Sequence, residues 1–506
     1  MPEDVFKWIR LAIKKEWKIA FYSTVIIGFL THMYVFTNML PNHDGLINIY
    51  SEQQKYSSGR FFLSQSSGIT SFFDLPWIIG VFSILYLSIT SVLYVELFRL
   101  KQTSAIILSS GLIVTFPTVA STFSYMFTAD AYMAGILLAF LAIFVTQKYK
   151  FGFLAGGLIL YISVGIYQAN LSVLLTIITL WFINELLVHR KYKPLIFELS
   201  RLVIMGVIGM VLYAITFKIY QQHGEITSYQ GLNQIGGQLG GIKDNLRTIK
   251  ETVNDFFLRG FVSDFPVNLF EVLNIFLLIL IVIGIIVLFI QHKLSILKTT
   301  LLVTSLVLLP VFSYILYFVS PGVSYHMLMV MALVSIYLVP IIFYERLDKP
   351  NALGKLFSWG AVITLALVIF NFAIISNIAY FNMTLKYEKS YSLANRILDR
   401  VEETEGYEKV TKLAIIGRKP VHTNISTDRV TQSIPKMTGA MGEVFLVQPY
   451  HFSAMLENQL GTKIGLVNRE ELDSLKASDL VQEMVPWPSK ESIQIIGEVA
   501  IIKLSD

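Results

Sequence analysis

Long apolar segments alternate with short polar segments along the first three quarters of this chain. Because about 20 apolar residues are needed to cross the hydrocarbon core of a bilayer, the pattern predicts about eleven transmembrane helices. They lie at residues 19–40, 75–98, 105–122, 131–146, 151–166, 171–188, 199–220, 267–290, 298–319, 326–344 and 353–375. No small-residue cleavage site follows the first segment, so we predict an anchor rather than a removable signal peptide.

The basic residues indicate how these helices are oriented. Every loop predicted on the inner side contains Lys or Arg, whereas three of the predicted outer turns contain neither. Residues 1–18 are basic and carry two tryptophans, which is typical of a segment on the cytoplasmic face. The positive-inside rule therefore places the N-terminus in the cytoplasm and the loops 41–74 and 221–266 outside.

The outer loop 221–266 contains an amphipathic stretch of its own. Its apolar positions follow helical spacing, at Ile242, Leu246, Ile249 and Val253, and basic residues flank them. This pattern predicts a helix lying in the membrane interface. The glycine pairs before it are not a phosphate-binding loop, because the required Lys-Ser/Thr ending is missing.

The composition becomes that of a soluble domain from about residue 382. The pattern predicts a small α/β domain, 382–506, which follows a membrane domain at 1–381 and lies outside. Its expected helices are 392–405, 452–460 and 470–475, and its expected strands are 412–417, 444–448, 493–496 and 499–504, the last two forming a hairpin. The predicted fold class is thus an α-helical polytopic membrane protein with a C-terminal extracytoplasmic α/β domain.

Composition supports this fold class and excludes some chemistry. Of the 506 residues, 54% are hydrophobic and 15% charged, against about 25% charged in soluble domains. The mean hydropathy is +0.61. The chain has no cysteine, which excludes disulfides, thiolate catalysis and cysteine-ligated metal. Nothing resembles a nucleic-acid-binding module, so no nucleic acid is expected as a partner.

The outer loop after the first span carries the first candidate chemistry. Asp44 lies beside His43 on a predicted turn, and it is a candidate general base that would remove a proton from an attacking hydroxyl. It could instead only stabilise the turn. Arg60, in the same loop, could bind a phosphate, or its side chain could simply reach the lipid headgroups.

Asp130 is the only acidic residue between Glu96 and Glu185, and it begins a predicted span. A carboxylate at membrane depth is a candidate functional residue. The alternative is a helix cap, because Asp favours helix N-termini. The two interpretations are compatible.

Two predicted outer turns bring further polar groups to the same face. Gln168 and Asn170 lie in one turn, and Tyr325 and His326 in the other. Each could line a sugar site, although turns are polar in any case. A metal site would require His43, Asp44, Asp130 and His326 to converge, and no close ligand spacing favours it. A divalent metal is therefore possible but not favoured.

Several short motifs resemble one bacterial family of integral membrane proteins. They are Asn-His-Asp-Gly at 42–45, Ser-Gly-Arg-Phe at 58–61, Asp-Ala-Tyr at 130–132, and Pro-Trp-Pro at 486–488 before the terminal hairpin. The chain resembles the glucosyltransferase II family, of the GT-C fold class, over nearly its whole length. The common family pattern has Trp after Gly-Arg, whereas this chain has Phe61 and lacks the hydrogen bond of an indole.

The resemblance implies a transferase of the bacterial plasma membrane. Its donor would be a polyprenyl-phosphate-linked hexose, and its acceptor a cell-surface polysaccharide or teichoic acid. Asp44 would be the base, and Arg60, Asp130 and Tyr132 would lie in the donor or acceptor site, with His43 beside them. Arg60 or the basic face of the 242–258 helix would meet the phosphate charge, and the sugar would be inverted.

The resemblance also bears on cofactors and partners. No nucleotide cofactor would be required, because the donor is already activated. An upstream polyprenyl-phosphate glycosyltransferase and a flippase would supply that donor.

Other functions remain open at this point. A transporter or flippase of polyprenyl-linked sugars would show paired repeats and broken helices, which this sequence lacks. A glycan polymerase or ligase shares the many spans and a large outer loop, but it does not ordinarily need a C-terminal α/β domain. A docking protein would leave the Asp44–Arg60 loop without a chemical role.

Overall fold

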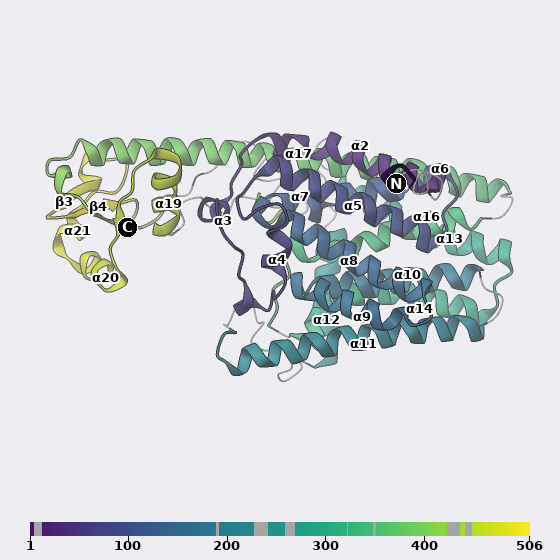
Figure 1. The fold of residues 1–506 in the computed structure, drawn as a ribbon. Helices are drawn as coiled ribbons and strands as arrows, with labels where there is room; N and C mark the ends of the chain where they lie inside the picture. The colour runs from purple at the N-terminus through teal and green to yellow at the C-terminus, as the bar shows by residue number, and fades with distance from the viewer. Residues whose placement is uncertain are drawn as a thin grey trace.

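A computed structural model shows a long helix bundle with a small domain, built around a β-sheet, at one of its ends (Figure 1). The structure describes residues 1–4, 13–188, 192–226, 241–258, 269–320, 322–347, 351–419, 421, 436–440 and 448–506.

Nine helices among the described residues are long and apolar enough to cross a membrane. They are α2 (Lys15–Thr37), α5 (Pro76–Phe98), α6 (Thr103–Thr115) with α7 (Pro117–Phe123), α8 (Ala129–Lys148), α10 (Asn170–Val188), α11 (Tyr192–Gln222), α13 (Phe270–His292), α14 (Ile296–Ser313) and α17 (Ala352–Glu402). Two further apolar helices are shorter, α9 (Gly152–Ile166) and α16 (Val334–Glu345). The prediction of a polytopic helical protein is confirmed, and each predicted span corresponds to one of these elements.

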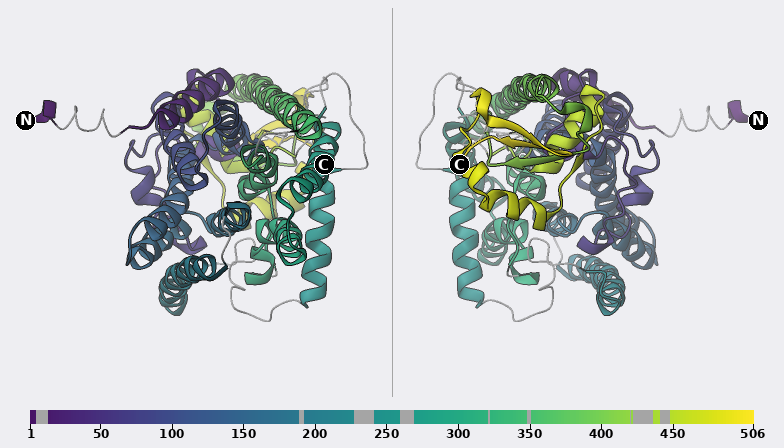
Figure 2. Two further views of the ribbon diagram at one scale, coloured as in Figure 1. Left: turned by 90° about the vertical axis from the view of Figure 1, so that its right-hand side faces the viewer. Right: turned by 90° about the vertical axis from the view of Figure 1, so that its left-hand side faces the viewer.

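The helices differ in how deeply they lie within the bundle, which Figure 2 shows from its two ends. The apolar window of Thr103–Phe123 is 94% buried, whereas that of Ile296–Ser313 is 22% buried. The pair α6 and α7 therefore forms the centre of the bundle, and α14 presents apolar side chains outward. Such an outward apolar face suits contact with lipid chains.

Three of the predicted spans are interrupted. The span predicted at 298–319 divides into α14, which ends at Ser313, and the short helix α15 (Leu316–Val319). Phe116 is extended between α6 and α7 because the following Pro117 disfavours helical backbone at the residue before it. The span predicted at 326–344 begins with two short 3₁₀ turns, Met327–Met329 and Met331–Leu333, before α16. The 3₁₀ turns place irregular backbone beside the cavity described below, which Met327, Leu328 and Val330 line.

The helix α17 joins the two parts of the molecule. Helices were predicted separately at 353–375 and 392–405, but both belong to one helix of 51 residues. At 1.5 Å per residue it is about 75 Å long, more than twice the thickness of a hydrocarbon core. No Gly or Pro follows Gly360 within it. The boundary predicted at 381/382 therefore falls inside a continuous helix.

The C-terminal domain contains a four-stranded sheet in the order β2-β1-β4-β3. The strands are β1 (Lys412–Ile416), β2 (Gly465–Leu466), β3 (Ile493–Ile496) and β4 (Val499–Lys503), and the helices are α19 (Pro449–Leu460), α20 (Arg469–Ala477) and α21 (Asp479–Glu483). β1 is parallel to β2 and β4, and β3 pairs with β4 as the predicted antiparallel hairpin. The strand predicted at 444–448 lies almost wholly outside the described residues.

The helix predicted in the outer loop is α12 (Ile242–Phe257). Its predicted apolar stripe divides between two environments. Ile249 is buried in the bundle, whereas Ile242 is 72% and Leu246 43% exposed. One part of α12 therefore packs on the bundle and the other leaves an apolar surface at the side of the molecule.

Candidate functional site

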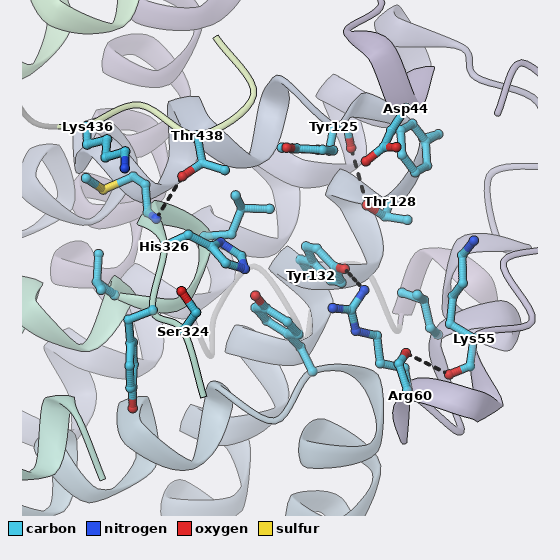
Figure 3. A pocket seen from close by; sticks show the side chains of 18 of the residues that line it. Asp44, Lys55, Arg60, Tyr125, Thr128, Tyr132, Ser324, His326, Lys436 and Thr438 are labelled. Carbon is cyan, nitrogen blue, oxygen red and sulfur yellow. Dashed lines mark hydrogen bonds between the residues drawn. The ribbon is translucent and has the colours of Figure 1, made fainter. Parts of the chain in front are cut away.

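A cavity of about 790 Å³ lies where the end of the bundle meets residues 436–438 of the C-terminal region (Figure 3). Its size is within the range of small-molecule sites. Its walls come from the loop after α2, the α7–α8 connection, α12, residues 314–330, and residues 436–438 of the C-terminal region. Segments far apart in the sequence thus line one partly open cavity.

Asp44 lies in the short helix α3 (His43–Ile47) and lines this cavity. The helix is capped by Asn42, whose Oδ1 accepts the Gly45 N–H at 2.8 Å. Asn42 thus supplies a side-chain hydrogen bond that stabilises this turn, which was the alternative role given for Asp44. The Asp44 side chain is 43% exposed, and its Oδ2 lies 3.6 Å from His43 Nε2. A partly exposed carboxylate beside an imidazole could accept a proton from a bound hydroxyl.

Arg60 is held among aromatic side chains of the same cavity. Its Nη1 donates a hydrogen bond of 2.9 Å to the hydroxyl of Tyr132, and its guanidinium lies 5.1 Å from the ring centre of Tyr167. The two tyrosine rings stack at 4.6 Å. Cation–π contacts of this kind hold a guanidinium in place without neutralising its charge. Arg60 therefore lies in a fixed position in the cavity wall.

Gln168 holds the loop that carries Arg60. Its Nε2 donates to Ser58 O at 2.7 Å and to the Tyr213 hydroxyl at 3.0 Å. A side chain at Gly59 would collide with both partners, since its Cβ would lie 2.7 Å from the Tyr213 oxygen and 2.8 Å from Gln168 Nε2. The structure places Gln168 behind the Arg60 loop, outside the main cavity.

Asp130 and Asn170 are also placed outside the cavity wall. Asp130, in the first turn of α8, is 1% exposed. Its carboxylate accepts hydrogen bonds from Thr70 Oγ1 at 2.5 Å and from Ala131 N at 2.8 Å. Asn170 donates to Ser163 O at 2.9 Å. These residues join neighbouring segments, so the structure does not bring them together with Asp44.

Tyr325 and His326 line the cavity, as does Tyr132. Burial, together with the positive charge of Arg60, lowers the pKa of His326 to about 4. At neutral pH this imidazole is therefore uncharged, and it can donate or accept one hydrogen bond to a neutral ligand. Burial also raises the pKa of Tyr325, whose hydroxyl accepts the Leu316 N–H at 3.0 Å.

Sequence reasoning missed several residues of the cavity. They are Lys55, Tyr125, Asp255, Lys436 and Thr438. Lys55 could have been found, because it lies in the same loop as Asp44 and Arg60. Lys436 belongs to a segment with no recognisable pattern, and only the tertiary structure brings it here.

The basic face of α12 does not line the cavity. The lining residues from this helix are Thr252, Asp255 and Phe256, whereas Lys243, Arg247 and Lys250 are not among them. Of the two candidates for meeting a phosphate charge, the structure thus places only Arg60 at the cavity.

The residues considered for a metal site do not converge. Asp130 binds Thr70 away from the cavity, while His43 and Asp44 are neighbours in α3. Among the residues that the structure describes, no group of three or more His, Asp or Glu is placed to hold a metal ion.

Fold and cavity together define a polytopic membrane protein with a polar site at one end of its helix bundle. The chain belongs to the family described as glucosyl transferase GtrII, whose sequence model matches residues 33–344. The protein is accordingly a membrane glycosyltransferase. The match includes every site residue predicted from the sequence, and it ends before α17 and the C-terminal domain. A search of curated proteins gives no match.

Proposed function

We propose that this protein is an inverting glycosyltransferase of the GT-C class. It moves a hexose from a polyprenyl-phosphate donor to a cell-surface polysaccharide or teichoic acid on the outer face of a bacterial plasma membrane. The observation that supports this most directly is the cavity itself, which Asp44 and Arg60 both line. A carboxylate base and a fixed cation are the two groups that such a transfer requires.

The reaction is a single displacement at the anomeric carbon. The acceptor hydroxyl oxygen attacks that carbon while Asp44 takes the hydroxyl proton. The bond between the anomeric carbon and the phosphate oxygen breaks, and polyprenyl phosphate leaves with the electron pair. Its charge is stabilised by Arg60. Attack opposite to the leaving group inverts the anomeric centre.

The surroundings of Arg60 suit an amphipathic donor. A second, small pocket of about 40 Å³ adjoins Arg60 and is lined mainly by apolar side chains, among them Val164 and Leu171. A phosphate at Arg60 would have its apolar chain next to these side chains. We assign Gln168 and Asp130 to positioning this wall, because both hold segments that lead to Arg60 or Tyr132.

The distribution of charged residues between the two ends of the bundle supports an outward-facing site. Ion pairs gather at one end, where Lys14 binds Glu96 at 2.6 Å and Lys101 binds Glu16 at 2.8 Å. These residues lie in segments that the positive-inside rule assigns to the cytoplasm. The start of α3 and the cavity lie at the opposite end of α2 and α5, which we therefore assign to the outer face.

The test compares wild type with Asp44→Asn in membranes supplied with radiolabelled polyprenyl-phosphate hexoses and native cell-surface polymer. Loss of a general base should lower kcat by about 10²–10⁴-fold and leave the donor KM little changed. The control is Glu52→Gln, which removes an exposed carboxylate of the same loop that does not line the cavity.

Two results would contradict the proposal. If Asp44→Asn transfers sugar as fast as wild type, Asp44 is not the base. If wild type transfers from none of the hexose donors but moves a lipid-linked sugar across a vesicle membrane, the protein is a flippase.

A further inference from the structure

Residues 436–440 of the C-terminal region lie in the wall of the helix bundle. Met437 is fully buried and Ala440 is 1% exposed, and both belong to the hydrophobic core of the bundle. Asn382 Nδ2 donates to Ala440 O at 2.7 Å, and Ser121 Oγ donates to Thr438 O at 2.6 Å. This segment is therefore held at both its backbone and its side chains.

The backbone of Gly439 explains how closely the segment fits. Its φ is +90°, and a Cβ there would lie 2.6 Å from a ring carbon of Tyr125, a residue that lines the cavity. Only glycine fits this conformation and this space together. The Thr438 hydroxyl in turn accepts the Met327 N–H at 3.2 Å, which joins the segment to the turn that carries His326.

This attachment leaves Lys436 at the cavity. Figure 3 shows Lys436 and Thr438 on one side of it and Lys55 and Arg60 on the other. The Lys436 side chain is exposed, and no carboxylate of the described residues lies within ion-pair distance of its amine. An exposed cation in the wall of a partly enclosed polar cavity favours an anionic ligand there.

We propose that Lys436 is a phosphate-binding residue of the glycosyltransferase site, supplied by the C-terminal region. The inference rests on the proposed function, because the phosphate is that of the polyprenyl donor or one carried by the acceptor polymer. Residues 33–344, which the family match covers, would then form an incomplete site. The lysine amine donates hydrogen bonds to phosphate oxygens as a point charge, opposite to the planar Arg60.

The experiment uses the full-length enzyme and the variants Lys436→Gln and Lys436→Arg. Donor KM is measured at saturating acceptor, and acceptor KM at saturating donor. Lys436→Gln should raise one of the two by about 10- to 100-fold, as loss of a charge-assisted hydrogen bond does, with kcat changed less. Lys436→Arg should recover most of the loss, which a merely structural role does not explain.

The matched control is Lys490→Gln. Lys490 is an exposed lysine of the same domain that does not line the cavity. A rise in donor KM alone assigns Lys436 to the lipid phosphate, and a rise in acceptor KM alone assigns it to the polymer. Unchanged KM values for both substrates, or an equal effect of Lys490→Gln, would overturn the proposal.

A binding measurement separates this inference from the proposed function. The dissociation constants of polyprenyl phosphate and of poly(glycerol phosphate) are measured for wild type and Lys436→Gln, with neutral dextran as the control ligand. If wild type binds either phosphate probe and the variant binds it at least 10-fold more weakly, the assignment stands even without transfer. Equal binding of both probes by the two proteins refutes it.

Discussion

Arg60 shows how the immediate surroundings of a residue decide between a structural and a chemical role. An arginine near a membrane surface often extends its charge into the headgroups. Here the guanidinium lies between the cavity and the rings of Tyr132 and Tyr167, and the loop before it is tied down through Gln168. The charge is thus fixed at the cavity, as its proposed role toward a leaving phosphate requires.

The residue whose ionisation should most affect stability is Asp74, at the end of the loop before α5. It is 6% exposed, and burial raises its pKa to about 7. In the unfolded chain the carboxyl ionises near its usual value of 3.8, whereas in the folded protein it stays protonated until about pH 7. The stability of the folded protein should therefore fall as the pH rises from about 4 to 7.

We accordingly expect Asp74→Asn to raise the melting temperature in detergent at pH 8 and to have little effect at pH 4. One pKa unit corresponds to about 1.4 kcal/mol, so the gain could reach about 4 kcal/mol at pH 8. Melting curves of both proteins from pH 4 to 8 measure this. A constant difference over the whole range would mean that ionisation of Asp74 is not its cause.

At the scale of elements, the short helix α3 depends on the C-terminal domain. Leu46 is fully buried and belongs to the hydrophobic core of that domain, together with Phe452 of α19. Asn458 Nδ2 also donates to Leu46 O at 3.0 Å. The helix that carries Asp44 is thus held from outside the bundle.

Leu46→Ala should therefore lower kcat through a displaced Asp44, and it should also cost about 2–5 kcal/mol of stability. Leu46→Met, which nearly conserves volume, should cost less than about 1.5 kcal/mol and retain activity. The control is Leu504→Ala, a buried residue of the same core that is not in α3. Kinetics and melting curves of all three test this. Equal loss of kcat in the control would show that only domain stability matters.

At the scale of the whole molecule, α17 carries the C-terminal domain to one end of the bundle (Figure 1). Lys436 and Thr438 of the C-terminal region line the cavity. The basic residues of the short loops lie toward the other end, as the pairing of Lys14 with Glu96 illustrates. If the end with the basic loops is cytoplasmic, the cavity at the other end opens to the outside, and the substrate must enter it from outside the cell. The orientation of the protein in the membrane therefore decides on which side of the membrane the sugar is transferred.

Cysteine labelling answers this question, because the chain has no cysteine of its own. We expect Lys490→Cys to react with a membrane-impermeant maleimide in intact cells. Lys150→Cys, in an exposed loop between α8 and α9, should react only after the cells are permeabilised. The reverse pattern would place the C-terminal domain in the cytoplasm and contradict an outward-facing site.

Local patterns were enough to predict most elements. The spans, the amphipathic α12 and the terminal hairpin follow from the periodicity of apolar residues. This signal is local, because a short stretch of sequence is enough to show it. The sequence also placed Asp44 and Arg60 in one loop, so their proximity was foreseeable. The continuity of α17 could not be foreseen, because the polar composition of its second half is typical of a separate helix in a soluble domain.

The sequence alone determined a polytopic helical protein, the positions of its spans, and a loop with a carboxylate and a guanidinium. Only the tertiary structure decided which polar residues share the cavity. It brings His326 and Lys436 to the same cavity as Arg60, and it places Asp130 against Thr70 instead. The physical reason is that periodicity reports the face of an element that is buried. Which partner buries that face depends on packing between segments hundreds of residues apart.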